Sequence, residues 1–187
     1  MNAAVHSATV SIGALTLLLG GARSGKSALA VEIGRRHEGP VTFIATSPPS
    51  IDGDLSERIA RHRAERPAWP TIEEPIDLAG ALASAGDDLA IVDCVTLWVN
   101  NLLHRGDDET AIETAAVDVA ATTAARRGPT VVITNEVGLG VHPTTELGRR
   151  YRDLLGRVNQ RWAAAADTSL LLVAGRAVPL TDPWTLL

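Results

Sequence analysis

The chain has 187 residues, of which 45% are hydrophobic and only 3% aromatic, and its formal net charge is −5. This length suits one domain. The low aromatic content predicts an aliphatic core, as in helices packed on a buried parallel sheet, and the negative net charge argues against nucleic acid as the main partner. The lone Cys94 excludes an intramolecular disulfide and a cysteine zinc cluster. The sequence shows neither an apolar run of membrane-spanning length nor a signal peptide, so we expect a cytoplasmic protein.

The predicted elements alternate between strand and helix along almost the whole chain. Residues 1–12 are small and polar and are expected to form a flexible extension. Buried strands are predicted at 15–19, 41–45, 89–93, 130–134 and 169–174. Helices are predicted at 26–37, 54–66, 76–85, 107–127 and 145–165, with another beginning between 94 and 103, while 67–75 is a proline-rich connection. This order predicts one P-loop NTPase-like α/β domain over residues 1–187, with an open, mostly parallel sheet and helices on both faces.

The first strand runs directly into the pattern G-x-x-x-x-G-K-S, and a helix-forming segment follows at once. Strand, glycine loop and helix in this order are typical of a phosphate-binding loop. Its residues are Gly20, Gly21, Ala22, Arg23, Ser24, Gly25, Lys26 and Ser27. Glycines let backbone N–H groups converge on an anion, and the following helix turns its positive N-terminus toward the same point. Lys26 is therefore predicted to reach the β- and γ-phosphates of a nucleotide, and Ser27 to ligate Mg²⁺.

Polar residues also lie at the ends of three other predicted strands, at Thr46–Ser47, Asp93 and Asn135–Glu136. The carboxyl ends of parallel strands are where such a sheet gathers its functional groups. P-loop NTPases place an acid there that holds Mg²⁺ directly or through water, and Asp93 is predicted to do so, a surface acid being the alternative. For Glu136 three alternative roles stay open: it could polarise a nucleophile, contact a substrate, or cap the next turn.

His62 lies on the predicted helix 54–66, in line with Arg58 and Arg66 at four-residue steps. The two cations disfavour the imidazolium form and leave the ring neutral, which is its nucleophilic form. The same cations suit a phosphate chain and the charge that develops on it. The pattern by itself leaves two interpretations, a nucleophile for phosphoryl or nucleotidyl transfer and a structural or solvated histidine.

Several stretches together resemble the bifunctional adenosylcobinamide kinase/adenosylcobinamide-phosphate guanylyltransferases of cobalamin synthesis. They are Gly20–Ser27, Ile44–Ser47, Arg58-Ile59 with His62 and Arg66-Pro67, Asp93–Trp98, Thr134–Gly138, Tyr151–Asp153, Gly156, Asn159-Gln160 and Ala165–Asp167. The resemblance spans about residues 16–175, and its later stretches make it specific, because many kinases share the phosphate loop. It implies phosphorylation of adenosylcobinamide with ATP or GTP, followed by GMP transfer from GTP through a histidine to give adenosylcobinamide-GDP.

Residue by residue, the resemblance implies His62 as the guanylylated histidine, and Lys26 of the phosphate loop is the other predicted catalytic residue. Around the nucleotide it implies Ala45, Thr46, Ser47, Arg63, Ala64, Glu65, Arg66, Glu74 and Asp93. It also implies a homotrimer that acts on small molecules; Arg61 and His142 depart from the family pattern. Two other hypotheses stay open, a monofunctional small-molecule kinase and a nucleotide-gated switch or motor ATPase that moves a protein partner.

Overall fold

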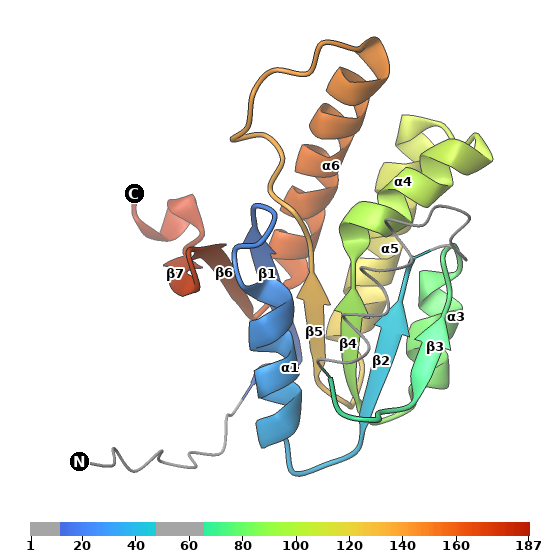
Figure 1. Cartoon of the computed structure of the whole chain (residues 1–187), viewed down its shortest axis with the longest axis vertical. Helices are drawn as coiled ribbons and strands as arrows, with labels where there is room; N and C mark the ends of the chain where they lie inside the picture. The colour runs from blue at the N-terminus through green and yellow to red at the C-terminus, as the bar shows by residue number, and fades with distance from the viewer. Residues whose placement is uncertain (1–11, 48–65) are drawn as a thin grey trace.

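Parallel strands form the centre of the molecule. The computed structural model describes residues 12–47 and 66–187. Its strands are β1 (Leu15–Gly20), β2 (Val41–Ala45), β3 (Thr71–Glu73), β4 (Leu89–Asp93), β5 (Thr130–Ile133), β6 (Thr168–Val173) and β7 (Arg176–Leu180). Within the described ranges they form a seven-stranded sheet in the order β3-β2-β4-β5-β1-β6-β7, in which β6–β7 is the one antiparallel pair (Figure 1). The predicted open, mostly parallel sheet is confirmed.

Helices cover both faces of this sheet, as predicted. In the described ranges they are α1 (Lys26–Arg36), α3 (Leu78–Ser84), α4 (Val95–Arg105), α5 (Glu109–Ala124), α6 (Glu146–Ala165) and the short 3-10 helix η1 (Pro183–Thr185). Figure 1 shows α1 in front of the sheet, and the other α-helices pack behind it. None of these helices combines the length and the hydropathy needed to cross a membrane. The predicted extension up to residue 11, and residues 54–65 of a predicted helix, lie outside the described residues.

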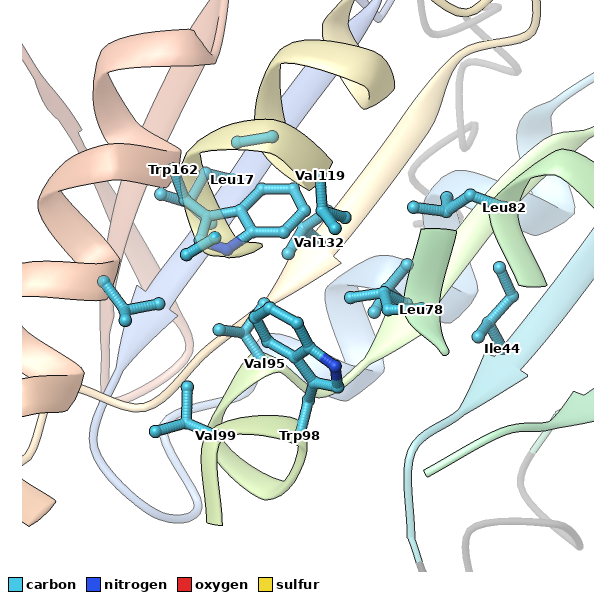
Figure 2. Close-up of a cluster of buried hydrophobic side chains, with 14 of the residues drawn as sticks. Leu17, Ile44, Leu78, Leu82, Val95, Trp98, Val99, Val119, Val132 and Trp162 are labelled. Atoms are coloured by element: carbon cyan, nitrogen blue, oxygen red, sulfur yellow. The ribbon is translucent and has the colours of Figure 1, made fainter. Parts of the chain in front are cut away.

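Two hydrophobic cores hold the layers together. The larger lies between the sheet and helices α3 to α6, and Figure 2 shows Trp98 and Trp162 among leucine and valine side chains there. The smaller core lies under α1. Successive residues of β1 face opposite cores, with Leu17 in the larger and Leu18 in the smaller, so both faces of the strand must be apolar. Each fully buried leucine or valine contributes about 1.5–3 kcal/mol, which is how an aromatic-poor chain stabilises this fold.

The sequence prediction is wrong at both edges of the sheet. Strand β3 falls within the proline-rich connection, and its side chains are exposed or half-buried, so no apolar run marks it. The predicted last strand, 169–174, is followed across a two-residue turn by β7, which is exposed along its whole length. Strand β7 contains Pro179, which an edge strand tolerates. Strand β6 is also not uniformly buried, because Thr168 and Val173 at its ends are exposed.

Candidate functional site

The predicted phosphate loop leaves β1 and enters α1 through two glycines in conformations that disfavour side chains. Gly20 has a φ of 150°, and Gly25, the N-cap of α1, has a φ of 105°. A Cβ on Gly20 would collide with the Leu172 carbonyl oxygen and lie 2.7 Å from Ser24 Oγ. The loop is therefore a tight turn around the N-terminus of α1, where backbone N–H groups without helical partners favour an anion.

The turn between β6 and β7 packs against this loop. Ala174 and Gly175, with φ values of 51° and 71°, form the turn. The Gly175 amide donates to the Ser24 carbonyl at 2.9 Å, and a Cβ on Gly25 would lie 3.2 Å from the Gly175 Cα. The edge hairpin, of which β7 was not predicted, thus supports the phosphate loop from one side.

Lys26 lies across the loop that carries it. Its Nζ donates to the carbonyl oxygens of Gly20 and Gly21, both at 2.7 Å, and to Ser24 Oγ at 3.3 Å. The residue is only 6% exposed. Burial lowers the pKa of Lys26, and electrostatic interaction with Cys94 and Asp93 opposes that shift. Because these carbonyl acceptors are neutral, the Lys26 ammonium can exchange them for the charged oxygens of a phosphate chain, which the backbone amides of the loop also bind.

The two predicted magnesium ligands meet at the start of α1. The Ser27 hydroxyl donates to Asp93 Oδ2 at 3.3 Å. A hydroxyl and a carboxylate are oxygen ligands that Mg²⁺ prefers, and this ion usually takes one or two protein carboxylates and completes its shell with waters and substrate phosphates. The donor set therefore fits Mg²⁺. Among the described residues no group of three or more histidines, cysteines and acids forms a metal cluster, so a fully protein-made cage is not seen in that part of the chain.

Thr46 ties the end of β2 to the end of β4 and so supports Asp93. Its hydroxyl donates to the Cys94 carbonyl at 2.7 Å and accepts the Cys94 amide at 2.8 Å, while its own amide donates to the Asp93 carbonyl. Asn101 on α4, a residue the sequence did not single out, donates to the Thr46 carbonyl at 2.8 Å. Thr46 is fully buried, and its side chain is engaged with protein. The buried Ser47 hydroxyl, in contrast, has no hydrogen-bond partner within residues 12–47 and 66–187.

The remaining described residues of the predicted site lie where β2 and β3 end. Ala45 is in register with Asp93, and its carbonyl accepts the Glu74 amide at 3.0 Å. Glu74 Oε1 accepts two backbone amides of the turn that precedes α3, both at 2.9 Å. Arg66 lies 3.8 Å from the centre of the Phe43 ring and donates to Thr71 Oγ1. The structure thus brings Ala45, Glu74 and Asp93 to one edge of the sheet and places Arg66 beside β2.

Glu136 lies beside the phosphate loop. Its amide donates to the Gly20 carbonyl at 3.1 Å, the same oxygen that accepts Lys26. Its Oε1 accepts the Gly138 amide at 2.6 Å, so of the three roles left open the structure shows the turn cap. His62, the predicted nucleophile, lies outside the described residues, as do Arg58, Arg63, Ala64 and Glu65.

Solved structures share this fold at low sequence identity. A prototypical ATPase from the type III secretion system of pathogenic bacteria superposes with a TM-score of 0.55 and 14% identity, over 88% of this chain and 52% of that chain. The Pyrococcus horikoshii OT3 protein PH0250 gives a TM-score of 0.55 and 11% identity, over 94% of this chain and 91% of that one. Together with the parallel sheet and the loop geometry, these likenesses confirm the predicted P-loop NTPase-like fold and no more.

Sequence comparison is more specific. A family model for cobinamide kinase / cobinamide phosphate guanyltransferase matches residues 16–180. The bifunctional adenosylcobalamin biosynthesis protein CobP of Pseudomonas aeruginosa is 43% identical over 168 residues, which cover 88% of this chain and 95% of the relative. The bifunctional adenosylcobalamin biosynthesis protein CobU of Salmonella typhimurium is 40% identical over 182 residues, 89% of this chain and 99% of the relative. This chain belongs to the cobinamide kinase / cobinamide phosphate guanyltransferase family.

Proposed function

We propose that this protein is a bifunctional transferase of cobalamin biosynthesis. It phosphorylates adenosylcobinamide with ATP or GTP and then transfers GMP from GTP to the product, giving adenosylcobinamide-GDP. The observation that carries this proposal is the family match over residues 16–180. This range includes a complete phosphate loop, whose buried lysine is hydrogen-bonded to two loop carbonyls. The relatives named above are described as bifunctional and are matched over nearly their whole length.

In the kinase step the phosphate loop holds the nucleotide. Backbone amides of Gly20–Ser27 bind the phosphate oxygens, and Lys26 moves from the loop carbonyls to the β- and γ-phosphates. Ser27 and Asp93 hold Mg²⁺, which when bound neutralises charge on those phosphates. The hydroxyl of adenosylcobinamide then attacks the γ-phosphorus, and the bond from that phosphorus to the bridging oxygen of the nucleoside diphosphate breaks.

In the second step His62 carries GMP. A ring nitrogen of His62 attacks the α-phosphorus of GTP and pyrophosphate leaves; the phosphate of adenosylcobinamide phosphate then attacks the same phosphorus and frees the histidine. Splitting one displacement into two is the usual gain of a covalent intermediate. The nucleotide contacts proposed for this step come from residues around the strand ends and the histidine: Ala45, Thr46, Ser47, Arg63, Ala64, Glu65, Arg66, Glu74 and Asp93. For Thr46 the hydrogen bonds to Cys94 favour a supporting role through Asp93.

Labelling with radioactive GTP tests the proposal. With Mg²⁺ and GTP labelled at the α-phosphate, the protein should acquire an acid-labile label, and GTP labelled at the γ-phosphate should leave none. The label should vanish in His62→Ala and persist in His104→Ala, which removes an exposed histidine at the end of α4. A label that survives in His62→Ala contradicts the nucleophile. Cobinamide-dependent phosphoryl transfer without any protein label favours the monofunctional kinase instead.

The proposal extends to assembly and location. We infer that residues 1–187 act as one transferase domain, and that three copies associate into a homotrimer in the cytoplasm. Light scattering coupled to size-exclusion chromatography measures the mass of the assembly directly. A mass of about 59 kDa, three times the 19.6 kDa of one chain, is the expected result, and a monomer or dimer contradicts it.

A further inference from the structure

Two buried polar side chains hold the backbone of Asn135 from both sides at the end of β5, and a third buried side chain lies between them. The Asn135 amide donates to Thr96 Oγ1 on α4 at 2.7 Å, and its carbonyl accepts Asn159 Nδ2 on α6 at 3.0 Å. Thr134 Oγ1 donates to Asn159 Oδ1 at 2.7 Å and lies 3.4 Å from Thr96 Oγ1. We call Thr96, Thr134 and Asn159 the Asn135 clamp. Each of the three is at most 8% exposed.

The hydrogen bonds of Asn159 fix the direction in which the Thr134 hydroxyl donates. Asn159 turns its amino group to the Asn135 carbonyl, so its oxygen must accept the Thr134 hydroxyl. Thr134 then has lone pairs left for the Thr96 hydroxyl, which in turn accepts the Asn135 amide. Each polar group therefore depends on its neighbour, and removing one hydroxyl leaves a buried partner unsatisfied.

The clamp determines where the next residue meets the phosphate loop. The Glu136 amide donates to the Gly20 carbonyl at 3.1 Å, and Lys26 Nζ donates to the same oxygen at 2.7 Å. Gly20 is buried, so this oxygen has little access to water. When Lys26 turns to a phosphate chain, the carbonyl loses one donor, and the Glu136 amide keeps it hydrogen-bonded. Without that amide, the movement of the lysine would leave a buried acceptor unsatisfied, and this free-energy cost would weaken nucleotide binding.

We propose that the Asn135 clamp is a set of positioning residues for nucleotide binding. The clamp holds the Glu136 amide on the Gly20 carbonyl and so lets Lys26 exchange this carbonyl for phosphate oxygens. The inference rests on the proposed function only in taking a nucleoside triphosphate as the ligand of the loop. Thr96, Thr134 and Asn159 act through the backbone and touch no phosphate themselves.

The test compares hydroxyl removal inside and outside the clamp. Thr134→Val keeps the shape of the side chain and removes the hydroxyl, and Thr134→Ser keeps the hydroxyl. Thr123→Val is the matched control, because Thr123 on α5 is also fully buried but its hydroxyl donates to the Val119 carbonyl of its own helix at 2.6 Å. Calorimetry would measure the Kd for α,β-methylene GTP with Mg²⁺, without cobinamide, so that neither transfer takes place.

We expect Thr134→Val to bind the analogue about tenfold more weakly, the effect of one lost buried hydrogen bond. Thr134→Ser and Thr123→Val should bind within about threefold of the unmodified protein, although both valine variants should melt at a lower temperature. Thr96→Val, which removes the acceptor of the Asn135 amide, gives a second variant with the same expected loss if Thr134→Val does not fold.

Unchanged affinity in Thr134→Val, or an equal loss in Thr134→Ser or Thr123→Val, would overturn the proposal. Failure of this proposal and failure of the proposed function would give different results. A protein that binds the analogue but neither phosphorylates cobinamide nor acquires a GMP label would refute the proposed function and leave the comparison of Thr134 variants fully interpretable.

Discussion

Replacing Gly20 by alanine is a direct test of the loop geometry. The φ of 150° at this position belongs to a region used almost only by glycine, and a side chain there costs about 1–3 kcal/mol. The added Cβ would also collide with the Leu172 carbonyl oxygen and lie 2.7 Å from Ser24 Oγ, and overpacking of this kind costs about 1–3 kcal/mol more. We therefore expect Gly20→Ala to lose about 2–6 kcal/mol of unfolding free energy.

The matched control lies one residue further along the same motif. Gly21 is exposed, has no positive φ, and a Cβ built on it meets nothing within 4 Å, so Gly21→Ala should change the unfolding free energy by less than about 0.5 kcal/mol. Urea denaturation gives both free energies, and for a chain of this size Gly20→Ala should lower Tm by at least about 4 °C. Nucleotide affinity should fall in Gly20→Ala, because the collision shifts the carbonyl that holds Lys26. Equal stability of the two variants would refute this account of the loop.

Three further predictions concern stability and reactivity. Ala174→Asn should stabilise the protein by about 1 kcal/mol in urea denaturation, because Ala174 and Gly175 both have positive φ in a two-residue hairpin, where asparagine before glycine is favoured; a loss of stability contradicts this. Arg126→Met should cost about 1–3 kcal/mol, because this guanidinium donates to backbone carbonyls of the connections that follow α3 and α5, whereas Arg127→Met, at an exposed neighbour, should be nearly neutral. Burial, reinforced by Asp93, raises the pKa of Cys94 from 9.0 to about 12, so without Mg²⁺ this thiol should resist alkylation at pH 8 until the protein unfolds. Between these two pKa values the folded state retains a proton that the unfolded state loses. The stability linked to this thiol is therefore present below pH 9.0 and is lost as the pH rises to about 12. Cys94→Ala should flatten this alkaline decline in the unfolding free energy, and an unchanged slope would contradict the prediction.

The central strands could be predicted from the sequence because burial on both faces requires continuous apolar runs. Strands β1, β2, β4 and β5 are buried along nearly all their length, and each appears as such a run. The edge strands leave no such trace. Strand β3 is exposed or half-buried and β7 is exposed, and both are held by backbone pairing with a neighbour, which is independent of side-chain type.

The phosphate loop could also be predicted, because its geometry requires glycine at fixed positions and these remain visible in the sequence. What surrounds the loop is not local. Gly175 donates to Ser24, and Glu136 donates to Gly20, across separations of more than a hundred residues in the chain. Such contacts follow from the strand order, in which β1 lies between β5 and β6, and no motif around the loop specifies that order.

Polar residues at strand ends show most clearly where sequence reasoning stops. Thr46, Glu74 and Asp93 follow the same rule of position, and the resemblance gave all three a place around the nucleotide. In the structure they differ in the use of their polar atoms: both polar functions of the Thr46 hydroxyl are taken by Cys94, and one oxygen of Glu74 is taken by two amides. Asp93, by contrast, is only half-buried and accepts the Ser27 hydroxyl at the start of α1. Position along a strand thus predicts that a residue belongs to the site, whereas burial and hydrogen bonding decide whether it meets the ligand or holds a residue that does.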